Sequence, residues 1–171
     1  NRRFDQLVTN MPGVVYRIRR DAEGNPHYDY VSPRCKDLTG IEPEALMADA
    51  SLWVNQIVPE DRVKYEALVH QNLADPQVFR WEGAVIVNGE RRWRRIESRP
   101  NQLPDGSIAW DGILTDITEA KRAEEALRDS EIRYRAMIEN QSEIISRYTP
   151  DTIITFVNEA SCRYFGKPRE Y

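Results

Sequence analysis

The spacing of hydrophobic positions changes along the chain, and each change marks a different kind of element. Phe4, Leu7 and Val8 have helical spacing and precede a Met-Pro-Gly break, which predicts a short lead-in helix at the N-terminus. The next two runs, VVYRIRRD (14–21) and HYDYVS (27–32), are rich in β-branched and aromatic residues, and a Gly-Asn-Pro turn separates them. They predict a β-hairpin.

Short helical segments follow between residues 33 and 75. RCKDLTG ends at a glycine, EPEALMADA has a proline in its first turn, and SLWVNQI leads to Pro59. The longest segment, PEDRVKYEALVHQNL, starts with that proline and two acidic residues, which favour a helix N-terminus. We therefore expect three short helices and one long one.

The rest of the first two thirds has a strand-like pattern. Phe79, Trp81, Val85 and Val87 share one parity, the Asn-Gly pair after them predicts a tight turn, and LPDGS (103–107) predicts a second turn. Hairpin-linked strands are antiparallel. The order of strands, helices and strands predicts an α+β fold.

The chain then repeats its own beginning. Residues of similar type recur 130 positions later: Phe4 with Tyr134, Leu7 with Met137, Val8 with Ile138, Asn10 with Asn140, Val14 with Ile144, Val15 with Ile145 and Arg17 with Arg147. After a turn shorter by four residues, Val31, Gly40 and Glu44 match Val157, Gly166 and Glu170. Residues 134–171 therefore predict the opening of a second copy, which alone cannot close a sheet and which we expect to be poorly packed or to use a partner's surface.

Several motifs share an order and spacing typical of one family. They are MPGVVYR, YVSPRCKDLTGIEPEAL, WVNQIVPEDR, FRWEGAVIVNGERRWRR, PDGSIAWDGILTDITEAKRAEEAL and the restart SEIRYRAMIEN. Together they resemble the PAS family and its PAS/PAC sensor modules. The resemblance implies a five-stranded antiparallel sheet with helices on one face, a cavity for a small-molecule ligand, and a signalling helix that leaves the last strand. It also implies a longer parent, such as a sensor histidine kinase or a diguanylate cyclase.

This reading divides the chain into a PAS/PAC sensor domain at 1–118, a connector helix at 119–133 and the truncated start of a second PAS domain at 134–171. Asp116, Ile117 and Thr118 match the family's DIT motif, which implies signal coupling at the strand-to-helix junction. From the residues alone, Asp116 or Thr118 can cap the new helix, and Asp116 with Glu119 has capping-box spacing.

The predicted connector helix carries a heptad pattern. Its seam positions alternate in steps of three and four residues: Ala120, Ala123, Leu127, Ser130, Tyr134 and Met137. Because small residues fill half of this seam, it predicts a weak coiled coil and a homodimer. The alternative is one amphipathic helix that packs on its own domain.

Aromatic residues are the candidates for a ligand site. Six of them could line a cavity or could fill the core of a small domain: Tyr16, Tyr28, Tyr30, Trp53, Trp81 and Trp110. The ligand or cofactor is unknown. His70 points away from the apolar face of its helix, which argues against haem ligation, and Cys35 lies outside any flavin-photochemistry motif. The resemblance therefore favours a sensory and signal-relay module, in which ligand occupancy or dimer packing changes the helix that starts at Asp116. The alternatives are a ligand-free interaction and dimerisation module and a haem or flavin sensor of redox state or gas.

Charge argues against nucleic-acid binding. The 171 residues carry 24 basic and 28 acidic side chains, for a formal net charge of -4. The basic run ERRWRRIESR divides by parity between two strand faces and predicts a solvated, ion-paired surface. The spacing of residues singles out no nucleophile, metal cluster or phosphate loop, so we expect a non-catalytic fragment.

Localisation follows from what the sequence lacks. It has no apolar run long enough to span a bilayer and no signal core, so we expect no membrane contact in this fragment and a cytoplasmic location. Cys35 and Cys162 are far apart and predict two reduced thiols. The start without Met and the abrupt end predict a piece of a longer parent.

Overall fold

The computed structural model describes residue 8 and residues 11–20 and 25–167, and it divides into two compact units, residues 1–119 and 120–171. The predicted lead-in helix lies outside the described residues except for Val8, which is helical and buried.

Five antiparallel strands form the sheet of the first unit. They are β1 (Gly13–Arg20), β2 (Pro26–Val31), β3 (Phe79–Val87), β4 (Glu90–Gln102) and β5 (Ile108–Asp116). Their order across the sheet is β2-β1-β5-β4-β3, so the first strand pairs with the last and joins the two halves of the sequence. This sheet confirms the predicted α+β fold.

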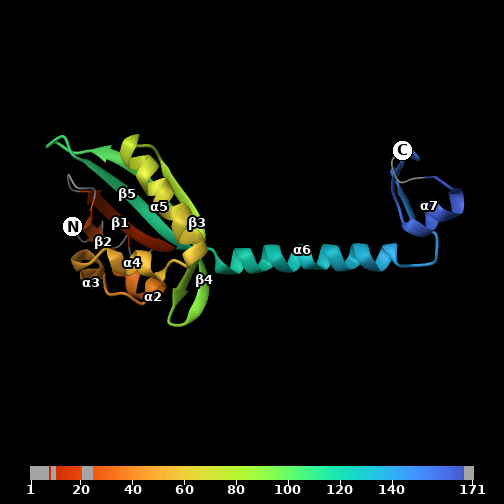
Figure 1. Cartoon of the computed structure of the whole chain (residues 1–171), viewed down its shortest axis with the longest axis horizontal. Coiled ribbons are helices and arrows are strands. Elements are labelled where there is room, and N and C mark those ends of the chain that lie inside the picture. Colours follow the sequence, from red (N-terminus) through yellow and green to blue (C-terminus); the bar gives the residue numbers. More distant parts are fainter. Residues whose placement is uncertain (1–7, 9–10, 21–24, 168–171) are drawn as a thin grey trace. The chain divides into compact units, whose positions relative to one another are not determined.

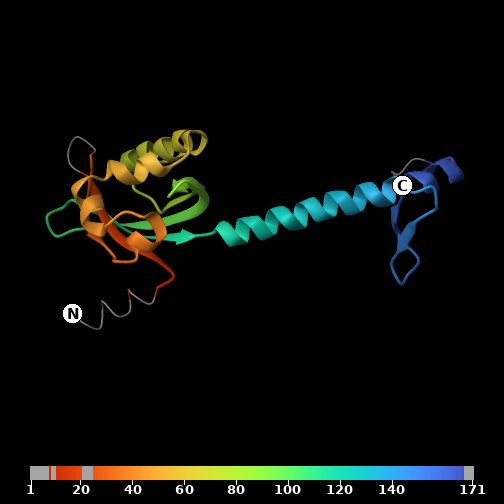
Figure 2. The same cartoon turned by 90° about the horizontal axis from the view of Figure 1, so that it is seen from below.

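The helices between β2 and β3 lie on one face of this sheet (Figures 1 and 2). They are α2 (Cys35–Thr39), α3 (Pro43–Ala48), α4 (Ser51–Gln56) and α5 (Pro59–Ala74). Pro43 and Pro59 occupy the first turn of their helices, where a missing N–H costs nothing. Gly40 ends α2 with a φ of 71°, a left-handed conformation that glycine adopts easily.

The β3–β4 turn also follows the prediction. Asn88 and Gly89 have φ values of 50° and 80°, as a type I′ hairpin turn requires. The alternating residues of β3, including Phe79, Trp81 and Val85, are buried against the helices.

A β-bulge changes the facing of side chains in β2. Arg17 pairs with Tyr30 and Ile18 pairs with Tyr28, so Asp29 is an extra residue in the ladder. Tyr28 and Val31 are both buried, whereas Tyr30 is only partly buried. The strand therefore switches parity between Tyr28 and Val31, which simple alternation does not predict.

The second unit contains most of a long helix, a hairpin and a short helix. Its elements are α6 (Thr118–Glu139), which begins in the first unit, β6 (Ser146–Tyr148), β7 (Ile154–Val157) and α7 (Glu159–Phe165). α6 runs past the 119–133 range predicted for the connector. β6 and β7 are antiparallel and carry a bulge of their own between Arg147 and Tyr148.

Candidate functional site

A cavity lies between the sheet and the helices of the first unit. Its volume is about 60 Å³, and four of the six aromatic residues singled out above line it: Tyr16, Tyr28, Trp53 and Trp110. The ring of Tyr16 lies over Gly112, where an added Cβ would come within 2.5 Å of the phenol oxygen. Gly112 therefore leaves the space that the Tyr16 ring occupies.

The other two aromatic candidates lie elsewhere. The bulge in β2 turns Tyr30 away from the cavity, and it lines a separate surface hollow with residues of α3. Trp81 is part of the core, with its ring 6.4 Å from that of Trp53 and 5.3 Å from that of Tyr65, both edge to face. It supports the wall of the cavity and does not line it.

Several lining residues were missed in the sequence. These are the polar or aromatic side chains of Arg20, Cys35, Thr39, Tyr65, Asn72, Phe79 and Ser98. The sequence pattern could have identified two of them. Ser98 has the same strand parity as the buried Ile96, and Asn72 lies two helical turns after Tyr65, on the same helix face. Asn72 accepts a hydrogen bond of 2.7 Å from the indole Nε1 of Trp110, which ties α5 to β5.

The phenols of the cavity remain neutral. Burial raises the pKa values of Tyr16, Tyr28 and Tyr65 above the ordinary value for tyrosine, and the neighbouring phenols add to the shift for Tyr16 and Tyr28. The side chains of Ser98 and Trp53 act against this shift at Tyr16 and Tyr65, respectively. The site thus offers neutral hydroxyl groups at any physiological pH.

Helix α2 contributes Cys35 and Thr39 to the lining of the cavity. Cys35 is fully buried as a free thiol, and burial raises its pKa. The Thr39 hydroxyl donates to the Cys35 carbonyl at 2.7 Å, and the Thr39 carbonyl accepts from the side-chain amide of Gln56 at 2.6 Å. α2 is therefore held by polar contacts as well as by packing.

The strand-to-helix junction is held by side chains of the DIT positions. The Asp116 carboxylate accepts a hydrogen bond of 2.8 Å from the Thr118 backbone N–H, so it caps the new helix. The Thr118 hydroxyl instead accepts from the Trp93 N–H at 2.9 Å, and the Ile117 N–H donates to the Trp93 carbonyl at 3.0 Å. α6 begins at Thr118, and the predicted capping box of Asp116 with Glu119 stays a prediction.

Arg94 connects this junction to α2. Its guanidinium pairs with Asp116 at 2.7 Å and also donates to the carbonyl of Leu38 in α2. The side chain is only 2% exposed, so the predicted solvated face is wrong at this residue, which has the parity of Ile96 and turns inward. Its Nε has no hydrogen-bond partner among the described residues.

Burial disfavours the charged forms of Arg94 and Asp116, whereas the opposite charge of the partner favours them. Burial lowers the pKa of Arg94, and the charge of Asp116 acts against that shift. For Asp116 burial alone would raise the pKa, but the hydrogen bonds from Thr118 and the charge of Arg94 outweigh it, so the pKa lies below its ordinary value. Both groups are therefore charged at neutral pH.

All six predicted seam positions of α6 are exposed: Ala120, Ala123, Leu127, Ser130, Tyr134 and Met137. Leu127, Tyr134 and Met137 are large apolar side chains on a helix that is otherwise rich in charge. Single exposed apolar residues are common, but a row of them at heptad spacing is typical of an interface.

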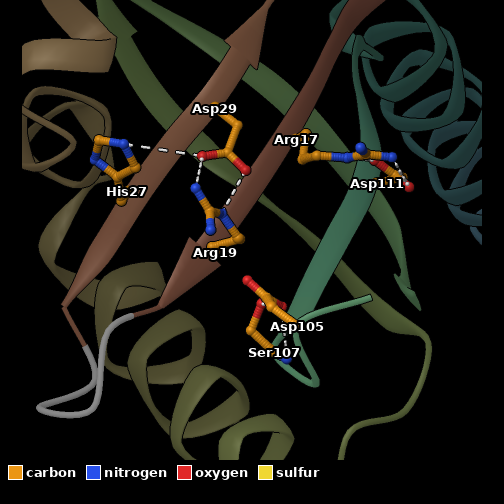
Figure 3. A network of polar contacts seen from close by, with 7 residues as sticks. All are labelled: Arg17, Arg19, His27, Asp29, Asp105, Ser107 and Asp111. Atoms are coloured by element: carbon orange, nitrogen blue, oxygen red, sulfur yellow. Dashed lines mark hydrogen bonds and ion pairs between the residues drawn. The ribbon is translucent and has the colours of Figure 1, made fainter. Parts of the chain in front are cut away.

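The outer face of the sheet carries paired charges, shown in Figure 3. Arg17 bonds Asp111 through two contacts of 2.6 and 2.8 Å, and Arg19 bonds Asp29 through two contacts of 2.5 and 2.7 Å. His27 lies 3.8 Å from Asp29. Since each of these guanidinium groups already faces a carboxylate, this face holds strands together and offers no anion site.

Haem ligation has no support from the position of His70, which is exposed and does not line the cavity. Within the described part of the chain, no three His, Cys, Asp or Glu side chains gather to hold a metal ion. No helix among the same residues has the length and apolarity to cross a membrane.

Comparison with known proteins assigns the family. Residues 28–113 match a family model described as PAS fold, and residues 132–171 match a second one described as PAS domain. The first match alone covers about half of the chain. The chain therefore belongs to the PAS family, as the motifs predicted, and its class is that of sensor domains in signal transduction.

Known relatives agree with this assignment. The two-component sensor PprA of Pseudomonas aeruginosa is 25% identical over 160 residues, which are 91% of this chain but only 17% of that protein. The sensory box histidine kinase/response regulator of Burkholderia thailandensis is 24% identical, with a TM-score of 0.57 over 78% of this chain and 98% of that chain.

The N-terminal domain of a diguanylate cyclase with PAS/PAC sensor, from Marinobacter aquaeolei, has a similar structure. It is 15% identical, with a TM-score of 0.55 over 64% of this chain and 98% of that chain. These two solved structures confirm the five-stranded PAS fold.

Proposed function

We propose that this chain is a sensory and signal-relay module in which the state of the cavity changes the start of α6. The helix then passes the change to downstream domains of a longer parent, of the histidine kinase or diguanylate cyclase kind. The two-component sensor relative and the PAS family membership support a sensory role. The cavity supplies a place for a signal, and the junction at Asp116 supplies an exit for it.

One observation carries this proposal: Arg94 touches both the cavity wall and the exit helix. α2 lines the cavity through Cys35 and Thr39, and the Leu38 carbonyl between them accepts from Arg94. The same guanidinium holds Asp116, which in turn holds the first N–H of α6. A displacement of α2 therefore reaches α6 through one side chain.

The energetics of Arg94 favour a response to displacement. Leaving a buried guanidinium donor without its acceptor costs about 1–3 kcal/mol of folding free energy or more. Arg94 is therefore expected to follow its acceptors when they move. α2 has only five residues and is therefore easier to move than α5. Arrangements that differ by a few kcal/mol can be shifted by a ligand.

We test this relay with hydrogen exchange at the start of α6. Val69→Phe places a ring into the cavity from α5 and mimics an occupant. Exchange of the amides of residues 118–127 is compared with and without Val69→Phe, first in the unchanged chain and then with Arg94→Met. We expect the filled cavity to change this exchange about threefold or more, and Arg94→Met to remove most of that response.

The matched control is Arg95→Met, since Arg95 lies next in β4 but points outward to Glu82 at 2.7 Å. It should leave the response to Val69→Phe intact. An equal response in the Arg94→Met background would contradict the relay.

We further propose that the seam of α6 pairs with the same seam of a second copy of this chain. Its exposed positions follow a heptad, and a heptad seam fits another helix with the same seam. Leu127→Glu should therefore lower the dimer fraction in light scattering. Ile132→Glu alters an equally apolar and exposed residue off the seam, and it should leave the dimer unchanged; equal effects of both would contradict the pairing.

A further inference from the structure

We propose that the cavity of the first unit takes a compact aromatic monocarboxylate, with the ring inside and the carboxylate at Arg20. This inference rests on the proposed sensory function and names the class of ligand for it.

The walls of the cavity suit a flat apolar body. Aliphatic side chains from both layers face it, with aromatic rings between them: Val14, Ile18, Leu46, Ile96, Leu114, Tyr28, Tyr65 and Phe79. The space of about 60 Å³ holds roughly four to six water-sized groups at about 10–15 Å³ each, which is one ring. A three-ring flavin or a haem would require the core side chains to move.

The charge of the lining favours an anion. Among the described residues that line the cavity there is no aspartate or glutamate, and Arg20 is the one charged side chain. A cationic ligand would be buried here without a counter-charge, which is costly. A carboxylate would instead meet a guanidinium, whose five N–H donors can serve a ligand in addition to contacts within the protein.

Arg20 lies beside two neutral phenols. It has the parity of Ile18, which pairs with Tyr28 across the β1–β2 ladder, so Arg20 and Tyr28 share the cavity side of the hairpin. The positive charge of Arg20 also acts on the pKa values of Tyr28 and Tyr65, against the larger effect of burial. The lining of the cavity thus combines a cation with phenolic hydroxyls.

The neutral Tyr65 phenol also lines the cavity, and a phenol O–H can donate to a carboxylate. Asn72 and Trp110 line the same cavity, but their 2.7 Å hydrogen bond joins them to each other. The phenols and Arg20 therefore set the preference.

Three probes of nearly one shape test the charge preference: benzoate, benzamide and benzamidinium. Each is titrated into the full chain, with binding measured by calorimetry and by the amide resonances of β1 and α5. We expect benzoate to bind about tenfold or more tightly than benzamide, because hydrogen bonds to charged groups are the stronger ones, and benzamidinium to bind weakest. Equal affinities, or no binding of benzoate to the folded chain, would overturn the assignment.

Variants locate the site. Arg20→Gln should lower benzoate affinity about tenfold and leave benzamide unchanged. Arg19→Gln removes the same charge from the opposite sheet face, where Arg19 pairs with Asp29, and should change neither. Val69→Phe fills the cavity and should abolish binding of both probes. An unchanged ratio of benzoate to benzamide in Arg20→Gln would refute the role of Arg20.

The result separates this inference from the relay. Benzoate binding without any change in exchange at residues 118–127 would support the ligand class and contradict the relay. A response of α6 to Val69→Phe without benzoate binding would support the relay and overturn the ligand class.

Discussion

Residues 13–40 of the first unit and residues 144–166 of the second unit share a hairpin and a helix, yet the first buries its apolar face and the second exposes it. Val14 is 3% exposed, whereas the matching Ile144 is 46% exposed. Tyr28 is 8% exposed, whereas Ile154, at the corresponding place in β7, is 59% exposed. In the first unit, α5 and β3–β5 supply the cover.

The local structure of the two copies is nevertheless the same. Ser32 and Val15 exchange two hydrogen bonds, from the Ser32 N–H to the Val15 carbonyl at 2.8 Å and from the Val15 N–H to the serine hydroxyl at 3.0 Å. Asn158 and Ile145 do the same at 3.0 Å each, with the amide oxygen in place of the hydroxyl. The hairpin and helix are thus specified locally, and burial is specified by the later elements.

Loss of a core ring should have the largest effect, and only in the first unit. Trp53→Ala should lower the free energy of unfolding by about 3–5 kcal/mol, because it removes a buried ring that packs on Trp81. All four Trp residues lie in the first unit, so the fluorescence of the remaining three reports its unfolding in urea. Phe165→Ala, at an exposed ring of α7, should change stability by less than about 0.5 kcal/mol, and a comparable loss there would show that the second copy is covered.

The second largest difference between the two copies should come from the residues that close their hairpins, Asn158 and Ser32. Asn158 is fully buried and also donates to the carbonyls of Ile138 and Glu143. Asn158→Ala should therefore lower the free energy of opening of the β6–β7 hairpin by about 2 kcal/mol. Ser32→Ala removes a single acceptor and should cost about 1 kcal/mol in β1–β2. Hydrogen exchange of the two hairpins measures both. A larger loss for Ser32→Ala would reverse the comparison.

Acid should weaken the junction of the first unit through Asp116. Its pKa is lower in the folded state, so its contribution is complete above the ordinary value of 3.8 and is lost as pH falls through the folded value. Asp116→Asn should be less stable than the unchanged chain by about 1 kcal/mol or less at pH 7. This difference should shrink as pH falls below about 4. A constant difference from pH 7 to pH 2, by urea unfolding, would argue against the ion pair with Arg94.

The smallest expected effect concerns an arginine present in both copies. Arg17 pairs with Asp111 on β5, and both side chains are partly exposed, so Arg17→Gln should cost about 0.5 kcal/mol. Arg147 occupies the same place in β6, and Arg147→Gln should cost nearly nothing, because no β5 strand lies beside β6 in its two-stranded sheet. Equal costs, measured by urea unfolding and hydrogen exchange, would contradict this reading.

Local chemistry explains what the sequence could predict. The turn at Asn88 and Gly89, the proline at the start of α5 and the alternation of Phe79 and Trp81 each depend on neighbouring residues. The resemblance to the PAS family was confirmed because its motifs lie in these same segments.

The missed features depend on partners distant in the sequence. Tyr30 turns away from the cavity because of a bulge whose register is set by pairing with β1. Arg94 looked like part of a solvated basic run, but its acceptors include the Leu38 carbonyl and Asp116, which no local pattern connects to it. The local pattern around Tyr65 did not single it out, although its side chain lines the cavity.

Helix α6 has a mechanical consequence of its own. It has 22 residues, which correspond to a rod of roughly 33 Å at about 1.5 Å per residue. A tilt of about 10° at Thr118 would move the far end of such a rod by roughly 6 Å. In the proposed relay, the bonds of Asp116 and Arg94 would set the direction in which α6 starts, so a small adjustment at these bonds would be amplified along the length of the helix.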